Sequence, residues 1–163
     1  MVYLVPLPGL AVVALLAYSD VRTRRIPRAW TLLGVIVQLL TILAYCAVRQ
    51  QDLWSIVLAV SIGSVCAIIQ AALALIRPGA LGLGDVGATA LASLSIGILG
   101  WPAAILFWLF MGLLGIVAMV FYYHWPLSTQ LTKQSIKRKP LPFVTVIVTA
   151  GLATTLASFL LSM

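Results

Sequence analysis

The sequence is short of negative charge. It contains no glutamate and only three aspartates, Asp20, Asp52 and Asp85, and charged residues of both signs make up 8% of its 163 residues. Soluble domains carry about 25% charged residues, whereas 63% of this chain is hydrophobic, so a soluble globular domain is excluded. Because an ionisable residue beside hydrocarbon is costly and usually functional, the few carboxylates are the first candidates for a functional site.

Metal-binding and redox motifs are also lacking. Cys46 and Cys66 lie inside hydrophobic segments and form neither a C-x-x-C nor a zinc-binding spacing, so they are expected to be buried free thiols. The single histidine, His124, is expected at a membrane boundary. The sequence therefore predicts no metal site and no cofactor. It gives nucleic-acid binding no support beyond the net charge of +7, because no basic and aromatic surface is patterned for it.

Six hydrophobic stretches are each near, or somewhat short of, the ~20 residues that cross a bilayer. Because a spanning segment must satisfy its own backbone hydrogen bonds, the fold class is predicted to be all-α, a single polytopic transmembrane helix bundle over residues 1–163. No Lys or Arg precedes the first stretch, which is therefore expected to remain as a helix and not to be a removable signal peptide. The predicted segments are Val2–Ser19, Ala29–Val48, Leu53–Ile76, Val86–Leu99, Trp101–Tyr123 and Leu141–Leu161.

Positive charge is concentrated in alternate connections. Nine Lys and Arg residues fall in the first, third and fifth connections, against one, Arg49, on the other side. The positive-inside rule then places both termini outside, and Asp20 and Asp85 at the cytoplasmic face of the cell membrane. Membrane lipids are the expected surroundings, and no oligomeric state is assigned. The nine are Arg22, Arg24, Arg25, Arg28, Arg77, Lys133, Lys137, Arg138 and Lys139.

The third and fourth segments are rich in small residues, which allow helix backbones to approach closely in a membrane. These two segments flank the second aspartate, so tight packing is expected around it. The small residues are Ser61, Gly63, Ser64, Ala67, Ala71 and Ala72 in the third segment, and Gly87, Ala88, Ala90, Ala92, Ser93 and Gly97 in the fourth.

The two aspartates at hydrophobic segment ends have distinct settings. Asp85 closes Gly82-Leu83-Gly84-Asp85 at the start of the fourth segment, where glycines permit positive φ and an Asp is a natural N-cap. Asp20 lies at the C-terminal end of the first segment, where the helix macrodipole disfavours negative charge. Helix polarity alone therefore favours an ionised Asp85 and a protonated Asp20. Two carboxyl groups that share one proton are the minimum equipment of an aspartic peptidase.

In this order, the two settings resemble those of the type IV prepilin peptidases, membrane aspartic peptidases with a G-x-G-D motif and a first aspartate in a D-x-R-x-x-x-I-P motif. The resemblance implies an endopeptidase that cleaves the basic leader from a prepilin-like protein at the cytoplasmic membrane face. It implies Asp20 and Asp85 as catalytic residues, and a substrate-binding role for Gly82, Gly84, Arg22 and Pro27. The matching residues are Asp20, Arg22, Ile26 and Pro27 for the first motif, and Gly82, Gly84 and Asp85 for the second.

The chain departs from the family pattern at three points. Arg28 stands where the family commonly has Asn, and Gly87 stands where it commonly has Lys. Larger members also carry an N-terminal region with paired C-x-x-C motifs, associated with methylation of the new pilin N-terminus. This chain has no such motifs, so it resembles the short tight-adherence-type form, and methyl transfer is not expected.

Two other functions remain open from the residues. A proton-coupled transporter would use Asp20 and Asp85 as relay sites, although such sites favour the bilayer midplane and often accompany an internal repeat. A catalytically inactive relative would only assist pilus assembly, and Gly87 is the residue that keeps this alternative open.

Overall fold

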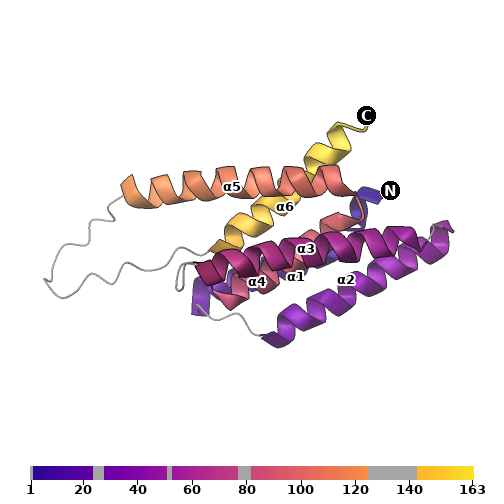
Figure 1. Cartoon of the computed structure of the whole chain (residues 1–163), viewed down its shortest axis with the longest axis horizontal. Helices are drawn as coiled ribbons and strands as arrows, with labels where there is room; N and C mark the ends of the chain where they lie inside the picture. Colours follow the sequence, from indigo (N-terminus) through magenta and orange to yellow (C-terminus); the bar gives the residue numbers. More distant parts are fainter. Residues whose placement is uncertain (1, 24–27, 51–52, 77–81, 125–142) are drawn as a thin grey trace, which may run out of the picture.

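The protein is all-helical in the part of the chain that the computed structural model describes, residues 2–23, 28–50, 53–76, 82–124 and 143–163. Six α-helices and one short 3₁₀ helix account for nearly all of these residues (Figure 1). The predicted fold class is confirmed, and the predicted segments match the helices to within a few residues. The elements are η1 (Val2–Leu4), α1 (Leu7–Thr23), α2 (Arg28–Arg49), α3 (Trp54–Ile76), α4 (Leu83–Gly97), α5 (Trp101–His124) and α6 (Phe143–Leu160).

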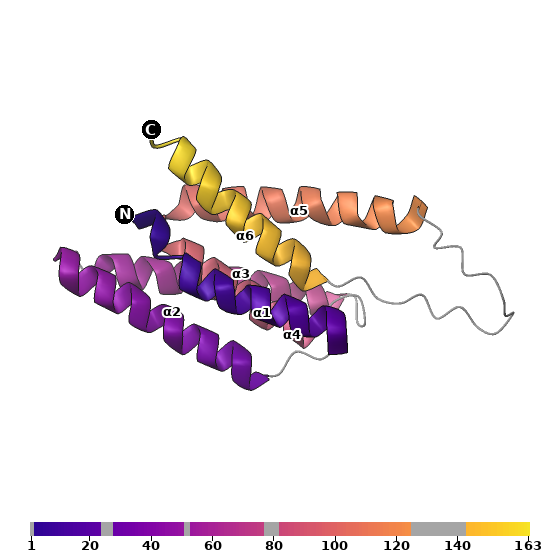
Figure 2. The ribbon, with the colours of Figure 1, turned by 180° about the vertical axis from the view of Figure 1, so that it is seen from behind.

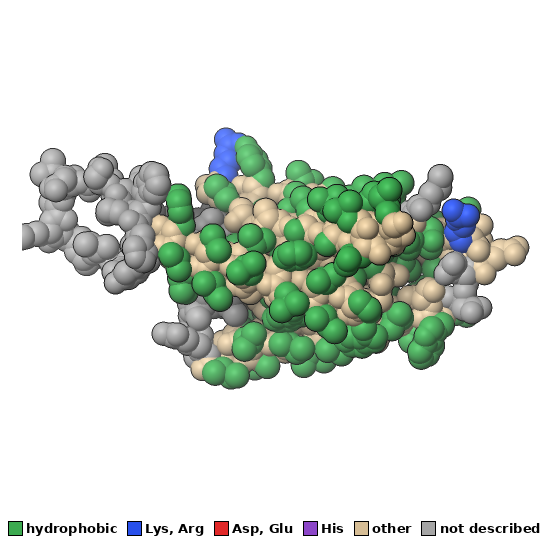
Figure 3. Space-filling view, turned by 90° about the horizontal axis from the view of Figure 1, so that it is seen from above, with side chains coloured by type: hydrophobic (Ala, Val, Ile, Leu, Met, Phe, Trp, Pro, Cys, Tyr) green, Lys and Arg blue, Asp and Glu red, His purple; other side chains and the backbone are tan. Residues whose placement is uncertain are grey.

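Five of the described helical segments are long and apolar enough to cross a membrane. Hydrophobic side chains cover the middle of the face shown in Figure 3, and the basic side chains visible there lie near its two ends. This distribution is what a lipid-facing surface requires, because charge at the bilayer centre is costly. The five segments are Val2–Arg22, Arg28–Arg49, Trp54–Ile76, Trp101–Phe121 and Phe143–Leu160.

The central helix of the bundle is α4, which contacts each of the other five α-helices. It has 15 residues, a length of about 22 Å at 1.5 Å per residue, which is less than the ~30 Å of a hydrocarbon core. Every residue from Leu91 to Gly97 is buried. A helix that is buried on all sides must be apolar or small on all sides, and this requirement explains the composition of the fourth segment.

Close contact between α3 and α4 confirms the role predicted for their small residues. A Cβ atom added at Gly97 would lie 2.8 Å from both the Cα and the carbonyl oxygen of Ala59. A Cβ at Gly63 would lie 3.1 Å from the Cα of Leu94. The two backbones therefore approach each other at glycines, as small residues at helix interfaces in membranes allow.

Gly97→Ala is expected to lower the free energy of unfolding by about 1–3 kcal/mol, because the new methyl group would meet backbone atoms that cannot rotate away. Gly112→Ala is the matched control, since a Cβ there would meet nothing within 4 Å and alanine raises helix propensity by about 1 kcal/mol. Thermal unfolding of both variants in one detergent measures the difference. A Gly97→Ala variant that unfolds at or above the unfolding temperature of Gly112→Ala would contradict the close approach of the α3 and α4 backbones.

The chain turns tightly between α4 and α5. Gly100, the last of the three residues between them, has a φ of +89°, in the left-handed region that a side chain rarely adopts. This single residue lets α5 begin at Trp101, only a few residues after α4 ends. The predicted start of the fifth segment at Trp101 is confirmed, and α4 ends two residues before the predicted Leu99.

The two chain ends lie at the same end of the bundle (Figures 1 and 2). There the ring of Tyr3 packs edge-on against Phe159, with centroids 5.5 Å apart. Gly151 of α6 lies against Leu10, early in α1, and against Ile96, late in α4. Helix α1 therefore runs antiparallel to α4 and α6, so that the end of α1 and the starts of α4 and α6 meet at the opposite end of the bundle.

A buried glutamine fixes the start of α1 against α2. Gly9 donates its backbone N–H to Gln38 Oε1 at 2.9 Å, and Gln38 Nε2 donates to the carbonyl oxygen of Val5 at 3.1 Å. The first N–H groups of a helix have no partner within the helix. Gln38 therefore satisfies one of them inside the bundle, which anchors the helix that carries Asp20.

Candidate active site

Asp20 lies in the last turn of α1, on the face that packs into the core. It follows Ala17 by three residues and Val13 by seven, which are spacings that share one face of a helix. Both of those residues belong to the core cluster that α1 forms with α4, α5 and α6. The Asp20 side chain is half-buried. Asp20 thus places a carboxyl group on the packed face of α1, at the edge of the core.

Asp85 lies in the first turn of α4 and closes that turn with its own side chain. The N-cap residue is Gly82, whose backbone N–H donates to Asp85 Oδ2 at 2.9 Å. The sequence prediction of Asp85 itself as the N-cap was therefore wrong. The physical role is retained, because a carboxylate at the third helical position can accept from the N-cap N–H. Gly82 has φ −84° and ψ 151°, an extended conformation, so this glycine does not use positive φ.

The surroundings of Asp85 raise the pKa of its carboxyl above the ordinary value. Burial contributes most, the hydrogen bond from the Gly82 N–H opposes it, and the negative charge of Asp20 raises the pKa further. Helix polarity alone favours an ionised Asp85. Burial and the neighbouring carboxyl act in the opposite direction, toward the protonated form of Asp85.

The structure brings the two predicted catalytic carboxyls together. The charge of Asp20 acts on Asp85, although 64 residues separate them in the chain. A like charge nearby disfavours the ionised form of a carboxyl, so the negative charge of Asp20 makes Asp85 easier to protonate. A paired acid and base at a helix-bundle end is suited to proton transfer, and we call Asp20 and Asp85 the carboxyl pair.

The structure gives fewer contacts for the other predicted site residues, Arg22, Gly84 and Pro27. Arg22 is exposed and donates from Nη1 to Tyr18 Oη at 3.2 Å, so it reaches back along α1. This interaction was not foreseen, although the spacing of four residues between Tyr18 and Arg22 is its sequence signal. Gly84 lies in the first turn of α4 and is half-buried. Pro27 lies outside the described residues, as does Ile26.

Gly87, the position of the common family lysine, faces α2. A Cβ atom there would lie 3.0 Å from Thr31 Cγ2. Residues two apart on a helix do not face each other, so Gly87 and Asp85 lie on different sides of α4. Glycine at this position permits close contact between α4 and α2 beside the carboxyl pair.

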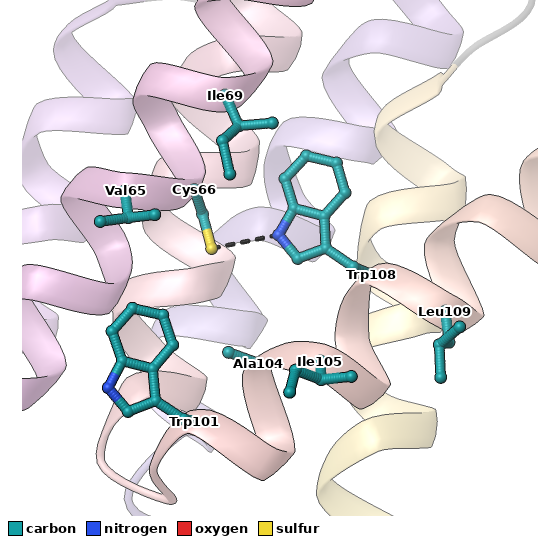
Figure 4. Close-up of a pocket in the computed structure, with 8 residues that line it drawn as sticks. All are labelled: Val65, Cys66, Ile69, Trp101, Ala104, Ile105, Trp108 and Leu109. Atoms are coloured by element: carbon teal, nitrogen blue, oxygen red, sulfur yellow. Dashed lines mark hydrogen bonds between the residues drawn. The ribbon is translucent and has the colours of Figure 1, made fainter.

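A separate cavity of about 370 Å³ lies between α3 and α5. Apolar side chains and two tryptophans line it, and the Trp108 indole N–H donates to Cys66 Sγ at 3.2 Å (Figure 4). The cavity uses the first turns of α5, toward the end of the bundle away from Asp85, and no ionisable pair faces it among the lining residues. Cys46 and Cys66 are both free and buried, as predicted. Within the described ranges, no three His, Cys, Asp or Glu side chains gather where they could hold a metal ion.

Comparison with protein families identifies the family of this chain. A family model described as the type IV leader peptidase family matches residues 8–120, which is more than half of the chain and includes both Asp20 and Asp85. Comparisons with curated proteins and with solved structures find no match.

Proposed function

The chain belongs to the type IV leader peptidase family, and from this membership and the carboxyl pair we propose that it is a membrane aspartic endopeptidase that removes the basic leader from prepilin-like proteins. The observation that carries the proposal is that Asp20, in the last turn of α1, and Asp85, in the first turn of α4, lie at the same end of the bundle, on helices that pack against each other. Aspartic peptidases require two carboxyl groups that share a proton. The family match covers both residues, so the pair and the family point to the same chemistry.

The proposed reaction follows from the protonation state of the pair. The ionised carboxylate accepts a proton from a water molecule, whose oxygen attacks the carbon of the scissile carbonyl. The protonated carboxyl donates a hydrogen bond to the carbonyl oxygen as negative charge develops there. When the tetrahedral intermediate collapses, a proton passes to the leaving amine nitrogen and the C–N bond breaks. General acid–base catalysis of this kind contributes about 10²–10⁴-fold to the rate.

The distribution of basic residues indicates the membrane face of the carboxyl pair and the kind of substrate that would reach it. We propose that the carboxyl pair lies at the cytoplasmic face, because nine of the ten basic residues fall in the connections on that side. A substrate with a basic leader and one apolar helix would place its leader at the same face by the same rule. The apolar helix would remain in the membrane, and the bond between leader and helix would come to the level of the pair.

The neighbourhood of the pair also suggests which groups contact substrate. Gly82 and Gly84 precede Asp85 and carry no side chain to obstruct an extended peptide beside the carboxyl. Arg22 lies two residues after Asp20 and is exposed. We keep Pro27 as a proposed contact from the family resemblance alone. Placement of both carboxyls at one end of the bundle favours a peptidase over a proton-coupled transporter, whose relay sites lie near the midplane.

A reconstituted cleavage assay tests the proposed function. The protein in lipid vesicles is expected to cut a single-helix substrate once, between its basic leader and its apolar helix, with both products identified by mass spectrometry. A matched substrate whose leader lysines and arginines are replaced by glutamine should be cut more slowly, because it does not adopt the same orientation. No cleavage of any basic-leader substrate, with the protein inserted and folded, would reject the peptidase proposal.

A further inference from the structure

Thr89 carries an unusual buried hydroxyl. Its side chain is fully buried on α4, with 0% exposure. Among the buried side-chain nitrogen and oxygen atoms of the described residues, Thr89 Oγ1 is the one that has no hydrogen-bond partner. Buried polar groups are nearly always paired, and an exception calls for a physical explanation such as a catalytic role.

Four other buried hydroxyls of the bundle have a hydrogen-bond acceptor within their own helix. Each donates to the carbonyl oxygen four residues earlier in its own helix, as Ser and Thr commonly do. The equivalent acceptor for Thr89 is the carbonyl oxygen of Asp85, which it does not use. The hydroxyls that bond in this way are Ser93 at 2.6 Å, Ser95 at 2.7 Å, Thr154 at 2.8 Å and Thr155 at 2.9 Å.

Thr89 lies directly below Asp85 on the same face of α4. It follows Asp85 by four residues, the spacing at which side chains on a helix are neighbours. The same face continues through Ala92 and Ile96 into the core shared with α1 and α6. Thr89 therefore occupies the next turn of α4, on the side of the carboxyl pair that leads into the bundle.

Asp20 lies in the last turn of α1, the helix that packs antiparallel to α4. The Cα–Cβ bonds of a helix tilt toward its N-terminus, so the Asp20 side chain is directed back along α1 into the bundle. Because α4 runs antiparallel to α1, the part of α4 at that depth lies beyond Asp85, and Thr89 is one turn beyond it. The Thr89 hydroxyl thus lies one helical turn deeper in the bundle than Asp85, on the side toward which the Cα–Cβ bond of Asp20 is directed.

We propose that the Thr89 hydroxyl is a positioning residue that donates a hydrogen bond to the Asp20–Asp85 carboxyl pair when the pair is ionised. The inference deepens the proposed function and rests on it for its catalytic consequence. A donor to the charged form favours that form, so Thr89 lowers the pH at which the pair gives up its first proton. It thereby keeps one carboxylate available as a base, while burial and mutual repulsion favour protonation.

The charged and titratable groups on the described parts of the helices around the pair can be named one by one. Helix α6 has no titratable side chain between Phe143 and Leu160, and Asp85 is the one titratable residue of α4. Helix α1 contributes Asp20 and the exposed Arg22, and α2 begins with the exposed Arg28. The side chain of Cys66, on α3, hydrogen-bonds Trp108 of α5 at the separate cavity. Thr89 is thus a neutral donor among like-charged carboxyls and exposed arginines.

Labelling with a hydrophobic carbodiimide, which reacts with protonated carboxyls, tests the proposal without any substrate. The protein in vesicles is labelled across pH, and adducts at Asp20 and Asp85 are measured by mass spectrometry. The pH at which labelling is half lost should rise by about 1 unit in Thr89→Val, the size expected when a hydrogen bond to a charged group is removed. Thr89→Ser should restore the wild-type midpoint. In the cleavage assay, the acidic limb of kcat/KM should move in the same direction.

Thr154→Val is the matched control, because Thr154 is equally buried but bonds to its own helix backbone. Its labelling midpoint should equal that of wild type. An unchanged midpoint in folded Thr89→Val, or an equal shift in Thr154→Val, would overturn the proposal. Thr89→Ala should show the same shift as Thr89→Val. If neither variant folds while Thr89→Ser does, the hydroxyl is purely structural, and the proposal is also overturned.

The two readouts separate this inference from the proposed function. A shifted labelling midpoint in a protein that cleaves no substrate would support the Thr89 contact and reject the peptidase. Normal cleavage with an unshifted midpoint would support the peptidase and reject the contact.

Discussion

Asp20→Asn and Asp85→Asn are each expected to lower the rate of leader cleavage by at least about 10³-fold, which is within the range for loss of a general acid or base. Asparagine has nearly the shape of aspartate but can neither accept the proton of water nor donate a carboxyl proton. Because the two carboxyls act as a unit, the double variant should be no slower than either single variant. The measurement is single-turnover cleavage in vesicles.

Asp52→Asn is the control for these two variants. Asp52 is the remaining acidic residue of the chain and lies in sequence between α2 and α3. Its replacement should therefore leave the cleavage rate unchanged. Thermal unfolding of all variants should show that they remain folded. Near-normal turnover by either Asp20→Asn or Asp85→Asn would be incompatible with a mechanism that uses two aspartates.

The helices and their limits were predictable because membrane segments are governed by simple rules. Hydrophobic length located all six helices, and small residues indicated the close contact of α3 and α4, which Gly97 and Gly63 confirm. The central position of α4 was not predicted. Its composition shows that it packs tightly, but the identity of its neighbours depends on contacts between residues far apart in the chain, such as Leu10, Ile96 and Gly151.

The residues of the candidate site were predictable from the sequence, but the burial of Asp85 and the position of the helix N-cap were not. Scarcity of carboxylates and the two motifs selected Asp20 and Asp85, and the structure brings these two together. Helix polarity favours a lowered pKa of Asp85, whereas its burial raises that pKa, because a sequence does not reveal how deeply a first-turn side chain is buried. Which of the two carboxyls holds the proton stays a prediction. The N-cap was misplaced by three residues for a related reason, since the choice between Gly82 and Asp85 depends on one hydrogen bond.

Gly87→Lys restores the residue that is common in the family, yet it is expected to lower the cleavage rate by about tenfold, equivalent to ~1.4 kcal/mol. Even a Cβ atom at this position would lie 3.0 Å from Thr31 Cγ2, and overpacking of a helix interface costs about 1–3 kcal/mol. The lysine would point toward α2, because residues two apart on a helix do not face each other. Its main effect on the carboxyl pair is therefore displacement of α4, with a smaller effect from its charge.

Three further variants separate crowding from charge. Gly87→Ala adds the methyl group without the cation, so crowding predicts a partial loss of cleavage there. Thr31→Ala, combined with Gly87→Lys, removes Thr31 Cγ2 and should recover much of the rate. Gly87→Met adds an uncharged side chain of similar length, so it should be as slow as Gly87→Lys if crowding dominates. A charge effect would instead shift the acidic limb of kcat/KM to lower pH in Gly87→Lys alone, because a cation favours the ionised carboxylate. Faster cleavage by Gly87→Lys than by the native chain at neutral pH would contradict the crowding effect and mark Gly87 as an impairment of the peptidase site.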